Sequence, residues 1–239
     1  MESIAPGSTQ LTHRSLNEST GILTTSGSQT LPSLTAILRR SKRHRGTNSP
    51  LRQVADNALR GAEGLVHPRA IYTKLELESL AALLRTHLPE EILSGTGSLI
   101  GVITTIGKQL EERASWLYSA GRFSEGYLLD YVGTLSVANF AQQVTRTLCA
   151  DQHAVRWAPG DNQQDRTLSA QRMLFEWIPA KEIDIHLTSN NVMIPAKSLS
   201  FLLFRGTRRD HKGCLIQCRR CVWNGCCDLQ AERQSGQVE

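Results

Sequence analysis

Apolar side chains recur every three or four residues in five stretches of the chain, the spacing that places them on one face of a helix. The stretch that opens with Ser49-Pro50 is the clearest, because a serine N-cap followed by proline is a typical helix start. In the longest stretch, the small residues Gly133, Ala138 and Ala141 would let a second helix pack closely. The predicted helices cover residues 34 to about 45, 50 to about 64, about 108 to 120, 124 to about 149, and about 169 to 177.

Short apolar and β-branched runs between these helices predict strands. Residues 99–106 have the pattern of a fully buried strand, and residues 70–73, 183–187 and 197–204 complete the predicted set. Polar residues interrupt residues 80–88 too often for an assignment. Several helices and few strands, without strict alternation, predict an α+β fold.

Composition divides the chain into three parts. Residues 1–32 are rich in Ser, Thr and Gly without periodicity, so we expect a disordered leader. Residues 33–206 hold the periodic segments and form the expected folded domain, and residues 207–239 are a basic, cysteine-rich tail. With 40% hydrophobic residues in a chain of 239, one domain of this size can bury a core.

Hydropathy and charge exclude several classes of protein. No apolar run approaches the roughly 18 to 20 residues that span a bilayer, and the first thirty residues lack a signal-peptide core. We therefore expect a cytoplasmic protein with reduced cysteines and no membrane contact. The net charge of +5 arises at the two ends, around a middle that is mildly acidic. The basic run in residues 39–45 has no aromatic neighbour for base stacking, so we do not assign nucleic-acid binding to it.

Five of the six cysteines fall within fourteen residues of the tail: Cys214, Cys218, Cys221, Cys226 and Cys227. Zinc is usually held by two Cys-x-x-Cys pairs, and only one pair occurs here. An iron–sulfur cluster suits thiolate ligands, but no standard ferredoxin spacing is met. Three interpretations stay open: a zinc or iron–sulfur site, redox-active thiols, and a tail without a defined role.

One turn carries a pattern suited to ligand binding, whereas phosphate loops, nucleophile elbows and His-Glu-x-x-His helices are missing from the sequence. Arg156 precedes the Ala158-Pro159-Gly160 turn, where a guanidinium can grip a carboxylate while main-chain atoms hydrogen-bond a heterocycle. Glycine in the turn lets a ligand approach closely. Taken alone, such a pattern more commonly belongs to a surface turn with a solvent-facing arginine.

Six short segments occur in a characteristic order: residues 67–72, 103–110, 129–133, 156–160, 171–175 and 187–200. In this order the chain resembles the activation domain of cobalamin-dependent methionine synthase, which binds S-adenosylmethionine, and the stand-alone proteins related to it. The resemblance extends over residues 34–204. It implies a C-shaped, mostly antiparallel sheet flanked by helices, with S-adenosylmethionine in a shallow groove.

The resemblance also implies roles for individual residues. Arg156 would hold the methionine carboxylate, and the backbone of Ala158 and Gly160 would border the adenosine, with Asp161 at a position that is usually tyrosine. Met193 and Pro195, in a Met-x-Pro segment, would lie near the side that faces cobalamin.

The implied function is reductive methylation of a corrinoid that has slipped from Co(I) to Co(II). The corrinoid would sit on a partner, either a cobalamin-dependent methionine synthase or a related corrinoid methyltransferase, and an electron donor would be required. The chain would be a component of a methyltransferase system rather than a complete enzyme, because the sulfonium is already a good leaving group and the task is positioning. A cluster on the cysteine tail could relay the electron.

Two alternatives remain. Asp161, together with Ala138 at a position that is often glutamate, fits a non-catalytic accessory or scaffold protein of such a system, with a degenerate S-adenosylmethionine groove. The basic ends and the cysteine tail fit a metal-binding regulator that acts on nucleic acid.

Overall fold

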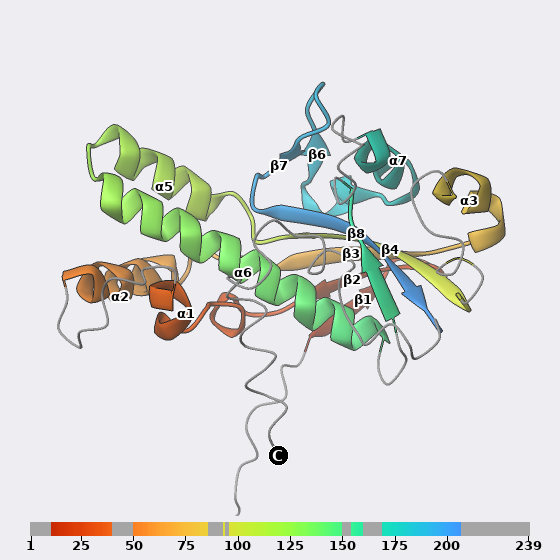
Figure 1. The fold of residues 1–239 in the computed structure, drawn as a ribbon, viewed down its shortest axis with the longest axis horizontal. Helices are drawn as coiled ribbons and strands as arrows, with labels where there is room; N and C mark the ends of the chain where they lie inside the picture. The colour runs from red at the N-terminus through yellow and green to blue at the C-terminus, as the bar shows by residue number, and fades with distance from the viewer. Residues whose placement is uncertain are drawn as a thin grey trace, which may run out of the picture.

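The computed structural model describes residues 11–39, 50–85, 93, 96–149, 154–159 and 169–206. Within these residues an antiparallel sheet is flanked by helices, and a further group of helices stands at one end of it (Figure 1). The α+β class is therefore confirmed. The helices are α1 (Leu34–Arg39), α2 (Pro50–Ala62), α3 (Leu77–Leu84), α5 (Gln109–Ser119), α6 (Phe123–Cys149) and α7 (Ser169–Trp177), with short 3-10 helices η1 (Gly27–Gln29) and η2 (Ala180–Ile183).

The main sheet has six strands in the order β1-β2-β3-β4-β8-β5, and every neighbouring pair is antiparallel. Strands β4 and β8 pair along their full length, from Ser98 opposite Arg205 to Thr105 opposite Ser198. A separate two-stranded hairpin is formed by β6 and β7. The strands are β1 (Thr12–Ser15), β2 (Thr20–Thr24), β3 (Arg69–Leu75), β4 (Ser98–Thr105), β5 (Ala154–Trp157), β6 (His186–Leu187), β7 (Met193–Ile194) and β8 (Ser198–Arg205).

Alternate residues of the central strands enter two different cores, because successive side chains of a strand point to opposite faces. On one face, Phe201 and Leu203 of β8 share a buried cluster with Phe140 of α6. On the other face, Leu202 and Phe204 share a cluster with residues of α3, α7 and η2. Both faces of β8 are thus covered, which explains why its sequence is a continuous apolar run.

A third core lies among the helices at the end of the sheet. It holds buried residues of α1, α2, α5 and the first half of α6. Helices α5 and α6 approach closely at Gly133, where an added Cβ would stand only 2.5 Å from Cδ2 of Leu110. The small residue predicted to permit close helix packing therefore does so.

The expectation of a disordered leader up to residue 32 is wrong for residues 11–32. Strands β1 and β2 lie there, and Ile22 and Leu23 of β2 enter opposite faces of the sheet. The rings of His13 and Tyr72 stack across Gly21, and His13 Nε2 lies 2.8 Å from Tyr72 Oη. Sequence patterning missed β1 because all four of its residues are exposed, so it shows no apolar alternation.

Most other predicted elements are confirmed, and three details differ. Residues 77–84, which the sequence left unassigned in part, form α3. The strand predicted for residues 183–187 is reduced to the two-residue β6, because Ile183 ends the 3-10 helix η2 and Asp184 follows in the left-handed conformation at φ 59°. Strands β5 and β7 were not predicted. In the part of the chain that the structure describes, no helix has the length and apolarity to cross a membrane.

Candidate functional site

Arg156 lies on β5, the strand at the end of the sheet order, opposite Leu203 of β8. Its side chain is half-buried, and its guanidinium carbon stands 4.9 Å from the centroid of the Phe201 ring. A cation over an aromatic face is attracted by the ring quadrupole. Arg156 is therefore held on the α6 face of the sheet rather than projecting from a loose turn.

The two residues after Arg156 anchor the same segment from both faces. Trp157 is only 4% exposed and belongs to the cluster on the α7 face. Ala158 is half-buried and packs against the cluster on the α6 face. The backbone leading into the predicted turn is consequently fixed, while Gly160 and Asp161 lie outside the described residues.

The Met-x-Pro segment forms part of the β6–β7 hairpin, which projects from the sheet beside α7 (Figure 1). Met193 packs against the cluster that contains Trp157. Pro195 is buried, and its carbonyl accepts a 2.7 Å hydrogen bond from Ser198 Oγ at the start of β8. The structure thus places Met193 and Trp157 on one face of the sheet and the Arg156 guanidinium on the other.

Helices α5 and α6 hold the backbone that follows Pro195. The carboxylate of Glu111 accepts hydrogen bonds from the backbone N–H groups of Ala196, at 2.8 Å, and Lys197, at 3.3 Å. The ammonium of Lys197 pairs with Asp130 at 2.8 Å and donates to Thr134 Oγ1 at 3.0 Å. Three of the ordered sequence segments, around residues 110, 130 and 195, therefore meet at this point.

Gln171 ties α7 to the same region from the other side. Its side chain is 6% exposed, and Nε2 donates a 2.6 Å hydrogen bond to the carbonyl of Asn191 in the hairpin turn. Its Oε1 lies 3.4 Å from Ser200 Oγ on β8. A buried amide with partners on both ends fixes the distance between helix, hairpin and strand.

Sequence reasoning gave no role to Glu111. Its partners are backbone groups 85 and 86 residues away along the chain, and no local sequence pattern indicates such contacts. The neighbouring Glu112 has the same chemistry but forms an exposed pair with Lys108 instead. Only the fold distinguishes the two carboxylates.

Resolved pKa shifts occur at the turn between α5 and α6, far along α6 from β5. A hydrogen bond from Arg122 lowers the pKa of Glu125. Burial, followed by the charge of Asp130, raises the pKa of Tyr118. These shifts mark a packed helix turn and do not belong to the β5 site.

Metal ligands are not gathered in the described part of the chain, where no group of three or more His, Cys, Asp or Glu residues could hold an ion. Cys149, at the end of α6, is buried there. The five cysteines of the tail lie outside the described residues, so the metal, redox and no-role interpretations of the tail stay predictions.

Comparison with known proteins gives one kind of match. No family model matches the chain, and no curated protein matches it. A crystal structure of the MetH reactivation domain bound to AdoHcy aligns with a TM-score of 0.59 over 81% of this chain and 80% of that chain. The likeness is one of fold. At 11% sequence identity it confirms a fold like that of the reactivation domain and leaves the ligand of this chain to be tested.

Proposed function

We propose that this chain binds S-adenosylmethionine beside β5 and supports reductive methylation of the corrinoid on a cobalamin-dependent methionine synthase or a related corrinoid methyltransferase. The observation that carries the proposal is the position of Arg156. It lies on a strand fixed from both faces, with its guanidinium held over Phe201, in a fold shared with a domain solved bound to AdoHcy.

The residues present suit the proposed ligand. A guanidinium presents a planar fork of donors that matches a carboxylate. The guanidinium of Arg156 lies over the Phe201 ring, which holds its plane in one orientation. Trp157, buried on the opposite face, anchors the same strand in the core. The backbone around Ala158 would border the adenosine.

The task of the chain in this function is positioning. When bound, S-adenosylmethionine supplies its methyl group to the Co(I) corrinoid of the partner, after a one-electron donor protein has reduced Co(II), and S-adenosylhomocysteine leaves. The contacts of Glu111 and Lys197 hold the backbone that follows Pro195 against the helices, and Gln171 links the hairpin to β8. A fixed arrangement of this kind lowers the entropic cost of bringing the reactants together.

Isothermal titration calorimetry with S-adenosylmethionine tests the proposal. We expect the 239-residue chain to bind, and Arg156→Ala to bind about 10- to 100-fold more weakly, because hydrogen bonds to a charged group contribute roughly 1.5 to 3 kcal/mol. Arg172→Ala is the matched control, because Arg172 is an exposed arginine on α7, and it should leave the affinity unchanged.

Two results would contradict the proposal. Absence of binding by the unmodified chain would favour the accessory or scaffold role. Equal affinity of the unmodified chain and Arg156→Ala would remove Arg156 from the site.

A further inference from the structure

Phe201 of β8 lies under the guanidinium of Arg156 because of the register of two strands. Arg156 on β5 stands opposite Leu203, which places Phe201 two residues along β8 on the same face of the sheet. Diagonal neighbours of this kind are roughly 7 to 8 Å apart, within reach of a long side chain. The guanidinium carbon approaches to 4.9 Å from the ring centroid. The ladder between β5 and β8 therefore determines the contact.

The ring of Phe201 is enclosed by the core, with only 1% of the residue exposed. Its partner on β4 is Val102, and both share a buried cluster with Phe140, Ala141 and Val144 of α6. A ring surrounded in this way has little freedom to move, because protein interiors are packed as densely as organic crystals. Phe201 is thus a rigid platform for Arg156, held in place by β4 and α6.

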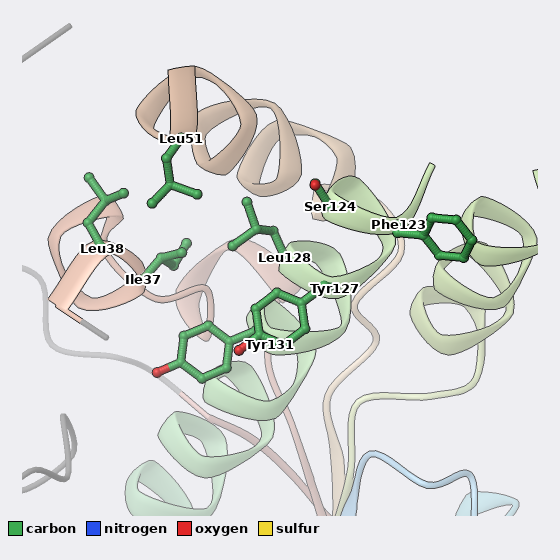
Figure 2. Close-up of a pocket in the computed structure, with 8 residues that line it drawn as sticks. All are labelled: Ile37, Leu38, Leu51, Phe123, Ser124, Tyr127, Leu128 and Tyr131. Carbon is green, nitrogen blue, oxygen red and sulfur yellow. The ribbon is translucent and has the colours of Figure 1, made fainter. Parts of the chain in front are cut away.

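Exposed aromatic rings in the described part of the chain provide the comparison. The guanidinium of Arg113 lies 4.1 Å from the centroid of Trp116 on α5, but Trp116 is 49% exposed. Figure 2 shows Phe123 and Tyr127 on the first turns of α6, and these residues are 66% and 50% exposed. Rings with so much free surface are less constrained by packing. A guanidinium over such a ring keeps more freedom than one over Phe201.

A rigid platform affects binding through conformational entropy. An arginine that samples several rotamers loses this freedom when a ligand fixes it, and the loss weakens binding. A guanidinium that is already oriented presents its planar fork of donors before the ligand arrives. Because Phe201 is buried, its influence on a ligand acts through Arg156.

The charges of S-adenosylmethionine show which of its groups benefits. The ligand carries one anionic group, the carboxylate, and two cationic groups, the ammonium and the sulfonium. The carboxylate gains from an oriented guanidinium, whereas both cations are repelled by it. Decarboxylated S-adenosylmethionine keeps the two cations and lacks the carboxylate, so the difference between the two affinities reports on Arg156.

We propose that Phe201 is a positioning residue: by orienting Arg156, it makes the site select a sulfonium nucleoside that carries a carboxylate over the same compound without one. This inference rests on the proposed function, in which Arg156 holds the carboxylate. It adds the source of the selectivity, which is a core aromatic ring that does not itself touch the ligand.

Calorimetric titration of the 239-residue chain with the two ligands tests the inference. We expect the unmodified chain to prefer S-adenosylmethionine about 10- to 100-fold. Phe201→Leu should lower this preference about threefold to tenfold, the usual cost of ordering one long side chain on binding. Phe140→Leu is the matched control, because it makes the same change in the same buried cluster, and it should keep the preference.

Two further measurements accompany the titrations. Circular dichroism establishes that the variants fold, and Phe201→Met is a second variant that fills most of the volume without an aromatic ring. NMR of the Arg156 side chain reports its orientation directly, because the ring current of Phe201 shifts its signals. These signals should move to ordinary arginine positions in Phe201→Leu and Phe201→Met and stay in place in Phe140→Leu.

The outcomes separate this inference from the proposed function. If the Phe201 variants weaken both ligands equally, the preference is unchanged and the inference is overturned, while S-adenosylmethionine binding stands. An equal loss of preference in Phe140→Leu also overturns it, in favour of a general loosening of the core. If neither ligand binds the unmodified chain, the proposed function and the selectivity fall together. In that case the NMR signals still decide whether Phe201 orients Arg156.

Discussion

Removal of the Glu111 carboxylate tests whether α5 holds the segment that follows Pro195. In Glu111→Ala the backbone N–H groups of Ala196 and Lys197 lose their acceptor. In Glu111→Gln the amide oxygen can replace one carboxylate oxygen, so part of the contact survives without the charge. Glu112→Ala removes a carboxylate from the same turn, where it pairs only with Lys108 on the surface.

The expected sizes of these effects differ clearly. A hydrogen bond to a charged group contributes about 1.5 to 3 kcal/mol, and the 3.3 Å bond to Lys197 is long enough to add little. Because Glu111 is half-buried, we expect Glu111→Ala to lower the free energy of unfolding by about 2 kcal/mol, and Glu111→Gln by about half as much. Exposed ion pairs contribute roughly 0 to 1 kcal/mol, so Glu112→Ala should stay below about 0.5 kcal/mol.

Urea unfolding followed by circular dichroism measures these differences, and thermal unfolding repeats them. For a domain of this size about 2 kcal/mol corresponds to roughly 4 to 8 °C in the thermal midpoint. Hydrogen exchange adds a local measurement, because the amides of Ala196 and Lys197 should lose protection in Glu111→Ala alone. Equal losses of stability in Glu111→Ala and Glu112→Ala, with unchanged exchange at these amides, would refute the reasoning.

Two further predictions concern the helices. Gly133→Ala should lower the free energy of unfolding by about 1 kcal/mol, because overpacking against Leu110 outweighs the better helix propensity of alanine. Gly61→Ala, where the added methyl group meets open space, should raise the free energy of unfolding by about 0.5 to 1 kcal/mol. Chemical denaturation measures both variants. Arg122→Ala should raise the pKa of Glu125 towards its ordinary value, because the pKa is lowered by the hydrogen bond from Arg122. The contribution of this pair to stability is present above the ordinary pKa of glutamate and is lost as the pH falls through the lowered pKa of Glu125. An NMR titration of the Glu125 carboxyl that finds the same pKa in Arg122→Ala would contradict this cause of the shift.

The sequence predicted the long amphipathic helices and the buried strands well, because both carry a strong periodic signal. Helix α6 was located to within a residue at its start, and β4 to within a residue at both ends. Strands β1 and β5 have four residues each, too few to establish a period. Strand β2 was missed because a Ser- and Thr-rich neighbourhood indicated disorder, although Ile22 and Leu23 are buried through pairing with β3, about 50 residues away.

In the candidate site, too, the sequence predicted what a local pattern indicates and missed what depends on distant segments of the chain. The sequence picked out Arg156 because an arginine before a proline-glycine turn is a local pattern. It placed this residue just before a turn and predicted no strand there, whereas the ladder between β5 and β8 puts it on a strand over Phe201. The acceptors of Glu111 and the partners of Gln171 depend on chain segments that meet only after folding, so no local pattern could reveal them.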